Sequence, residues 1–190
     1  MSTYIDLGKE PKDLEERQTL IKSHIIQIEE KETLGSNIIQ QRVFDLLVCE
    51  KGYPKEVISV NKAFKISLPD TSFDAFSDLS VTINGIIAII IKCAINSIES
   101  WERYSFAFAR TAEETYQIPF AIVTDSEKYI VLDVLAGNIF GRGVDNIPTY
   151  EFIKRFIENY KLEPYRGDKR EREKRILHAF SGLRCSPDSC

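Results

Sequence analysis

Asp78 and Lys92 are the two residues of this chain whose types and positions best suit chemistry. They lie in residues 77–93, which predict two β-strands joined at Asn84 and Gly85. A lone charge inside an apolar sheet is costly unless it is paired. The two charges are therefore either a salt bridge between neighbouring strands or the remains of a metal-dependent site that cleaves phosphodiester bonds.

The turn between these strands decides whether the two charges can meet. A two-residue loop puts Asp78 opposite Ile91 and sends Lys92 to the other face of the sheet. A three-residue loop, with Gly85 at positive φ in a bulge, puts Asp78 opposite Ile90, so that the two charges share a face. A site that functions, or once functioned, predicts the bulged turn, whereas two separate structural charges do not require it.

The composition is that of an ordinary globular chain with one main domain. The chain has 190 residues, of which 43% are hydrophobic and 28% charged, and its net charge is −4. This charge argues against coating nucleic acid by bulk electrostatics, although a local basic face is compatible with it. The apolar runs are too short to cross a bilayer, and residues 1–6 do not resemble a secretory signal. We expect a cytoplasmic protein with no membrane partner.

The four cysteines lack the spacing of a metal site. Cys49 and Cys93 lie in apolar segments and are expected to be buried thiols. Cys185 and Cys190 flank a short polar tail, where zinc would need two more ligands in a chain that has two histidines. The favoured interpretation is a reduced cytosolic protein with no small-molecule cofactor.

The order of helix and strand signals predicts an α/β (α+β) domain. Two helices come first, over residues 11–31 and from 36 to a stop at Gly52, with a break at Gly35. The elements expected next are a strand over 57–68, the hairpin over 77–93, a helix over 101–112, strands over 119–124 and 129–134, and helices over 149–160 and 168–180. Helices at both ends and between strands indicate a three-layer architecture.

Short motifs along the chain occur in the order typical of one family. They are Leu46-Leu47, Lys51-Gly52-Tyr53-Pro54-Lys55-Glu56, Asp78, Ile91-Lys92-Cys93-Ala94, Phe106-Ala107-Phe108-Ala109-Arg110, Tyr116-Gln117-Ile118-Pro119-Phe120-Ala121-Ile122-Val123-Thr124 and residues 171–180. Together they resemble the N-terminal nuclease-like domain of type I restriction enzyme R subunits, and more closely a stand-alone bacterial and archaeal branch of it.

The resemblance covers residues 37–180 and implies a restriction-endonuclease-like fold. In that fold a mixed central sheet is flanked by helices, and here extra N- and C-terminal helices are expected. On this basis the chain divides into an N-terminal helical extension over 1–35, a core over 36–145 and a C-terminal helical appendage over 146–190.

The same resemblance implies a PD-(D/E)XK catalytic motif, in which an Asp on one strand is followed by Glu-x-Lys or Asp-x-Lys on the next. Two carboxylates hold Mg²⁺, and the lysine orients the attacking water. Asp78 matches the metal-binding Asp and Lys92 the lysine, but Ile90 occupies the position of the second carboxylate. Weak or absent Mg²⁺ binding is therefore expected, as in a degenerate endonuclease.

Other carboxylates are candidates for the missing ligand. The sequence has no acid between Glu32 and Asp45, where the first core helix of the family often contributes one. Asp74 reaches the site only if residues 72–76 form a loop that folds back. Glu99 and Glu102 can approach from the following helix, but glutamates in the first turn of a helix usually face solvent.

Two functions remain open from the sequence. The first is a catalytically impaired domain that binds nucleic acid, DNA above all; if it cleaves, Asp78 holds Mg²⁺ and Lys92 positions water. The second is a protein-interaction module in which Asp78 and Lys92 form only an ion pair and the terminal helices bind a protein partner. The charged segment 168–175 is expected to be a solvated, salt-bridged face, and phosphate contacts by Lys169, Arg170 and Arg172 are the alternative.

Overall fold

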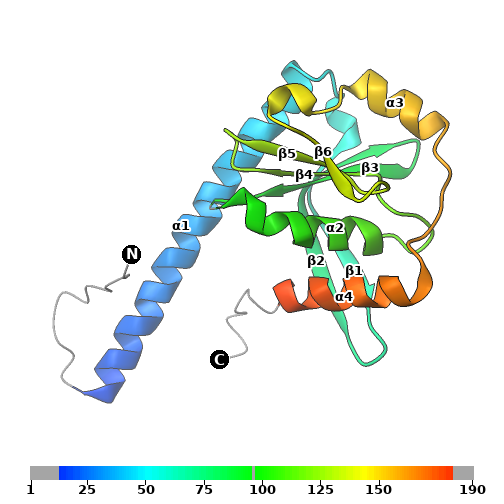
Figure 1. Cartoon of the computed structure of the whole chain (residues 1–190). Coiled ribbons are helices and arrows are strands. Elements are labelled where there is room, and N and C mark those ends of the chain that lie inside the picture. Colours follow the sequence, from blue (N-terminus) through cyan, green and yellow to red (C-terminus); the bar gives the residue numbers. More distant parts are fainter. Residues whose placement is uncertain (1–12, 96, 182–190) are drawn as a thin grey trace.

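A computed structural model describes residues 13–95 and 97–181 of the chain (Figure 1). Its helices and strands are α1 (Leu14–Cys49), β1 (Ile58–Ser67), β2 (Ser72–Ile83), β3 (Ile86–Cys93), α2 (Glu102–Thr111), β4 (Phe120–Thr124), β5 (Tyr129–Asp133), β6 (Asn138–Arg142), α3 (Tyr150–Glu158) and α4 (Gly167–Ser181). Short 3₁₀ turns η1 (Lys55–Val57), η2 (Ile98–Trp101) and η3 (Val144–Asn146) link some of them.

The strands form one sheet in the order β1-β2-β3-β4-β5-β6. Neighbouring strands are antiparallel except β3 and β4, which run parallel. A parallel pair needs a crossover connection, and α2 supplies it here. The sheet is therefore mixed, as expected.

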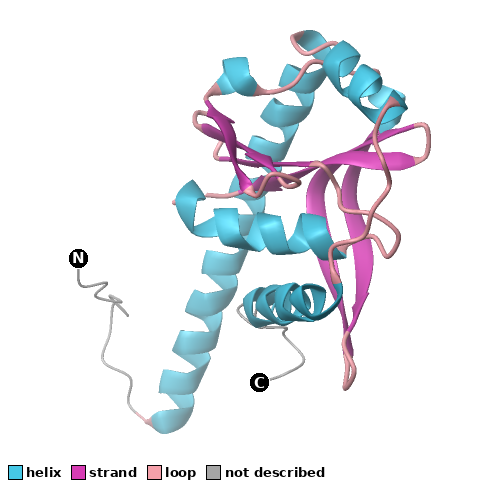
Figure 2. Cartoon of the chain, turned by 45° about the vertical axis from the view of Figure 1, so that its right-hand side comes forward, coloured by secondary structure: helices cyan, strands magenta, loops and turns pink. Residues whose placement is uncertain are grey.

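Helices cover both faces of this sheet (Figure 2). The C-terminal part of α1 packs with α3 on one face, where Val43, Leu47 and Ile153 are buried against Ile89 and Ile122. The other face carries α2 and α4, and its buried side chains belong to a second core cluster. The prediction of an α/β fold with a central sheet between helical layers is confirmed, while the three-part division of the chain stays a prediction.

The first helix differs from the expectation. It is a single helix through Gly35, so the predicted break is wrong. One glycine inside a helix costs about 1 kcal/mol relative to alanine, which does not end a helix whose flanks favour it. At Gly35 an added β-carbon would lie 3.3 Å from the Cδ1 atom of Ile95, so the glycine lets the loop after β3 approach the helix closely. The N-terminal part of α1 projects away from the sheet (Figure 1).

The strand β6 was missing from the expected elements. It follows a turn at Gly137, whose φ is +73°, and forms the outer edge of the sheet. Its side chains are mostly exposed, so it lacks the apolar run by which β4 and β5 were found. None of the helices in the described part of the chain combines the length and apolar character needed to cross a lipid bilayer.

Candidate functional site

The turn between β2 and β3 has two residues and not three. Ile83 pairs with Ile86, and both turn residues have positive φ, 51° at Asn84 and 79° at Gly85, as in a type I′ turn. The three-residue loop required by the functional hypothesis is therefore wrong.

A bulge elsewhere nevertheless brings the two charges to one face. The register shifts after Val81, which pairs with Ile89, so that Ala88 is the extra residue of β3. Leu79 then pairs with Ile91, and the next step along β2 places Asp78 directly opposite Lys92.

Asp78 and Lys92 form a buried ion pair. The Nζ atom of Lys92 lies 2.7 Å from Oδ2 of Asp78, and the residues are only 6% and 8% exposed. The backbone N–H of Cys93 donates a second hydrogen bond of 2.7 Å to the same oxygen. The ammonium group also lies 5.2 Å from the ring centroid of Trp101, a cation–π contact. Short, charge-assisted hydrogen bonds of this kind hold both side chains in fixed positions.

Two amides that the sequence did not indicate lie near Asp78, and one of them, Gln40, contacts it. Gln40 of α1 donates from Nε2 to the backbone carbonyl of Asp78 and to Oδ1 of Asn61, the latter over 2.9 Å. Asn61 lies on β1 between Val60, which pairs with Leu79, and Lys62, which pairs with Ser77, and it has a φ of 51°, an unusual value inside a strand. The signal that could have found it is an asparagine, a residue that tolerates left-handed backbone, within an otherwise regular strand pattern.

The surroundings of Lys92 are closed. The hollow beside it, lined among others by Ser77, Ser105 and Phe108, has no space for a water molecule. Trp101 in turn packs against Tyr104 and Phe180, with ring centroids 5.3 and 6.1 Å away. The hollow beside Lys92 is therefore too small to hold a water molecule.

The second metal-binding carboxylate is missing from the site. Ile90 lies opposite Ser80 and is buried in the core cluster beneath α2. Asp74 lies opposite Lys65 on the outer part of β2, and Glu102 is paired with Arg142 over 3.1 Å. Within residues 13–95 and 97–181, no group of three or more His, Cys, Asp or Glu residues could hold a metal ion. The described acids do not complete a two-carboxylate site.

The cysteines divide by burial. Cys93 is buried, and desolvation together with the charge of Asp78 raises the pKa of its thiol to about 12, against a smaller lowering effect of Lys92. Cys49 is exposed at the last residue of α1, so the expectation that it is buried is wrong. Cys185 and Cys190 lie outside the described residues.

The charged segment of α4 is salt-bridged, but much of it is not solvated. Arg170 donates to the carbonyls of Thr111 and Glu113, and to both the carbonyl and the carboxylate of Glu114, at the C-terminal end of α2. Glu173 is only 5% exposed and forms ion pairs with two arginines of α2. Arg170 is therefore engaged inside the protein, unlike Lys169 and Arg172, which are exposed.

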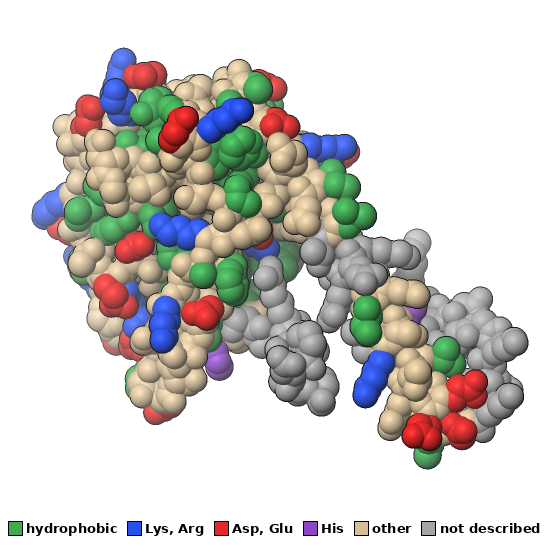
Figure 3. Space-filling model, turned by 180° about the vertical axis from the view of Figure 1, so that it is seen from behind, with side chains coloured by type: hydrophobic (Ala, Val, Ile, Leu, Met, Phe, Trp, Pro, Cys, Tyr) green, Lys and Arg blue, Asp and Glu red, His purple; other side chains and the backbone are tan. Residues whose placement is uncertain are grey.

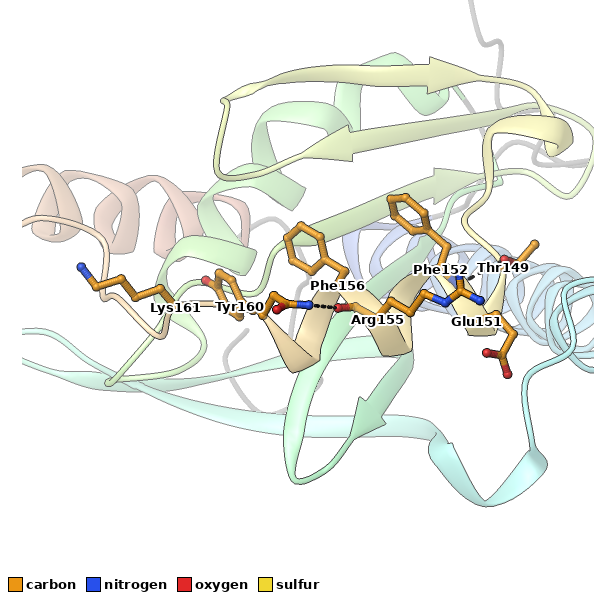
Figure 4. A pocket seen from close by; sticks show the side chains of 8 residues that line it. Thr149, Glu151, Phe152, Arg155, Phe156, Tyr160 and Lys161 are labelled. Atoms are coloured by element: carbon orange, nitrogen blue, oxygen red, sulfur yellow. Dashed lines mark hydrogen bonds between the residues drawn. The ribbon is translucent and has the colours of Figure 1, made fainter.

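Another hollow lies on the other face of the sheet, along α3. It is an open groove of about 620 Å³. Phe152 and Phe156 point from the helix toward the strands, while Arg155 and Lys161 lie along its rim (Figure 4). Ring contacts of 5.1 Å from Phe120 to Phe156 and 6.0 Å from Phe120 to Phe140 continue this aromatic surface to β6.

Comparison with models of protein families gives one match. Residues 36–148 match the family described as "Type I restriction enzyme R protein N terminus (HSDR_N)", in agreement with the resemblance carried by the motifs. Comparisons with curated proteins and with solved structures gave no match.

Proposed function

The chain belongs to the type I restriction enzyme R protein N terminus family, and on this premise we propose that it is a nuclease-like domain that binds nucleic acid without cleaving it. The observation that carries the second half of this proposal is the ion pair between Lys92 and Asp78. Membership of a restriction-related family supports the first half.

Cleavage by this family's motif would require a divalent cation at Asp78. The Lys92 ammonium lies 2.7 Å from one carboxylate oxygen, so a second cation at that oxygen would meet strong repulsion. Mg²⁺ is strongly hydrated and is held by one or two carboxylates with several waters. The buried pair leaves no space for such a hydrated ion beside Lys92. The residues present therefore do not fit a magnesium site.

Metal titration tests this proposal directly. Calorimetry with Mn²⁺ and Mg²⁺ at millimolar concentration should give the same absence of binding heat for the parent chain and for Asp78→Asn. Duplex DNA incubated with either metal should stay intact. Binding heat in the parent that Asp78→Asn abolishes, together with DNA cleavage, would overturn the non-cleaving assignment.

A protein-interaction module is the second candidate, and exposed apolar side chains favour it. Leu14, Ile26 and Leu34 are exposed on α1, as are Phe140 and Phe152 beside the groove of α3. If the chain is such a module, it should show no salt-dependent affinity for nucleic acid. Binding to duplex DNA at several salt concentrations measures this.

A further inference from the structure

We propose that the outer face of α4 contacts the phosphate backbone of double-stranded nucleic acid. This inference deepens the proposed function and rests on it. The face consists of three exposed basic side chains, those of Lys169, Arg172 and Arg175. Among the described residues, none of the three forms an ion pair.

The structure separates charges that alternate along the sequence. Glu173 turns inward, where its carboxylate lies 3.0 Å from Nη1 of Arg110 and also pairs with Arg103. Glu171 pairs with Lys174, which is buried. Apart from Asp168 at the start of the helix, both acids of α4 are therefore paired with basic residues, Glu173 in a buried place and Glu171 at a half-exposed one, and the three basic side chains of the outer face stay unpaired.

The three basic residues follow one another at intervals of three. With 3.6 residues per turn, each is turned about 60° from the last, so Lys169 and Arg175 lie about 60° on either side of Arg172 on the exposed side of α4. A helix rises about 1.5 Å per residue, so Lys169 and Arg175 are about 9 Å apart along the axis. Duplex DNA carries a phosphate about every 3.4 Å of each strand, measured along its axis. A row of this length spans several phosphates, and arginine binds phosphate oxygens with two parallel N–H donors.

The helix that presents this row is firmly attached. Leu177 is fully buried in the core cluster, and Phe180 packs against Trp101 and Tyr104. Arg170 ties the other end of α4 to the last carbonyls of α2. The basic side chains therefore extend from a fixed axis, which lowers the entropy cost of ordering them on a ligand.

The net negative charge of the chain lies mostly elsewhere. Residues 1–35 contain eight acidic and five basic residues, so residues 36–190 are close to neutral. Two of these acids, Glu15 and Glu16, are in the first turn of α1. The face seen in Figure 3 mixes positive and negative side chains over the body and shows acids at the end of the projecting helix. A local basic row can act because exposed charges beyond about 10 Å are largely screened at ordinary ionic strength.

Salt-dependent binding to a duplex of about 20 base pairs tests the proposal. Fluorescence anisotropy should compare the parent with the triple variant Lys169→Gln, Arg172→Gln, Arg175→Gln. Each lost phosphate contact should reduce the slope of log K against log salt by about 1, so the triple variant should lose a slope of about 3. The matched control, Lys55→Gln, Lys128→Gln, Arg155→Gln, removes the same charge from exposed positions elsewhere and should keep the parent slope.

Several results would overturn the proposal. One is an equal loss of slope in the two triple variants. Another is a parent chain that shows no salt-dependent binding to the duplex. A third is tighter binding of polyglutamate than of the duplex, which would indicate an acidic protein partner. Thermal unfolding checks that the variants fold. If the triple variant does not fold, Arg172→Glu alone should still reduce the slope by about 1, and an unchanged slope would count against the proposal. The two experiments test different claims. Metal-dependent cleavage by the parent would contradict the non-cleaving function but would not contradict phosphate binding by α4.

Discussion

Lys92 faces Asp78 directly across β2 and β3, with its ammonium group 2.7 Å from the carboxylate. In the sequence motif, Ile90 occupies the position of the second carboxylate and Lys92 follows two residues later. In the structure it is Lys92, not residue 90, that lies across from Asp78. A fixed ammonium group therefore balances the charge of the Asp78 carboxylate.

The first prediction concerns this ion pair. Lys92→Met should destabilise the protein by about 3–5 kcal/mol, because it leaves a buried carboxylate without its cation. The double variant Asp78→Asn, Lys92→Met should be more stable than either single variant, since neither charge is then buried alone. Urea unfolding measures both effects. The exposed pair of Lys161 and Glu163 provides the control, because Lys161→Met should cause no measurable change. A Lys92→Met variant as stable as the parent would show that the pair does not form.

The second prediction concerns the turn that aligns the two strands. Gly85 has a φ of +79° and no atom within 4 Å of the position of an added β-carbon. Gly85→Ala should therefore cost about 1 kcal/mol through backbone strain alone. Asn84→Gly, which suits the positive φ of that residue, should change the free energy of unfolding by less than about 0.5 kcal/mol. Equal stability of the parent and Gly85→Ala would contradict the two-residue turn.

The third prediction concerns the thiol beside the pair. Its pKa is raised from 9.0 to about 12, so the folded protein keeps a proton on Cys93 that the unfolded chain releases. The stability due to this proton is complete below pH 9 and is lost as the pH rises toward 12, with a slope of about 1.4 kcal/mol per pH unit. Cys93→Ala should show a correspondingly shallower alkaline loss. Iodoacetamide at pH 8, followed by peptide mapping, should label Cys49 and spare Cys93; rapid labelling of Cys93 would refute its burial.

The fourth prediction concerns the attachment of α4. Glu173→Gln should destabilise the protein by about 1.5–3 kcal/mol, because Arg103 and Arg110 lose a charge-assisted partner in a mostly buried place. Hydrogen exchange in α4 should become faster than in α3. Glu158→Gln, on the exposed side of α3, should stay within about 0.5 kcal/mol of the parent. Unchanged exchange in α4 would mean that Leu177 and Phe180 alone hold the helix.

Local patterns predicted much of this fold. Apolar runs identified β4 and β5, and Thr149 was recognised as the start of α3, where its hydroxyl accepts from the N–H of Phe152. Gly35 was misjudged because its role depends on Ile95, a contact that no local pattern reveals. The edge strand β6 was missed because most of its side chains stay exposed.

The candidate site was predictable in part. The cost of burying a lone charge predicts that Asp78 and Lys92 are paired, and the structure shows them as an ion pair. Their register was not predictable, because a bulge at Ala88 depends on how β3 packs between two layers and not on turn residues. Gln40 was equally hidden, since a polar residue on a helix gives no sign that it bonds to a strand carbonyl.

The unbroken α1 has a mechanical consequence. At about 1.5 Å per residue its 36 residues extend over about 54 Å, and among the described side chains it is the C-terminal part that packs on the sheet. A partner bound near Leu14 would therefore be held by one continuous helix at a fixed distance from the sheet.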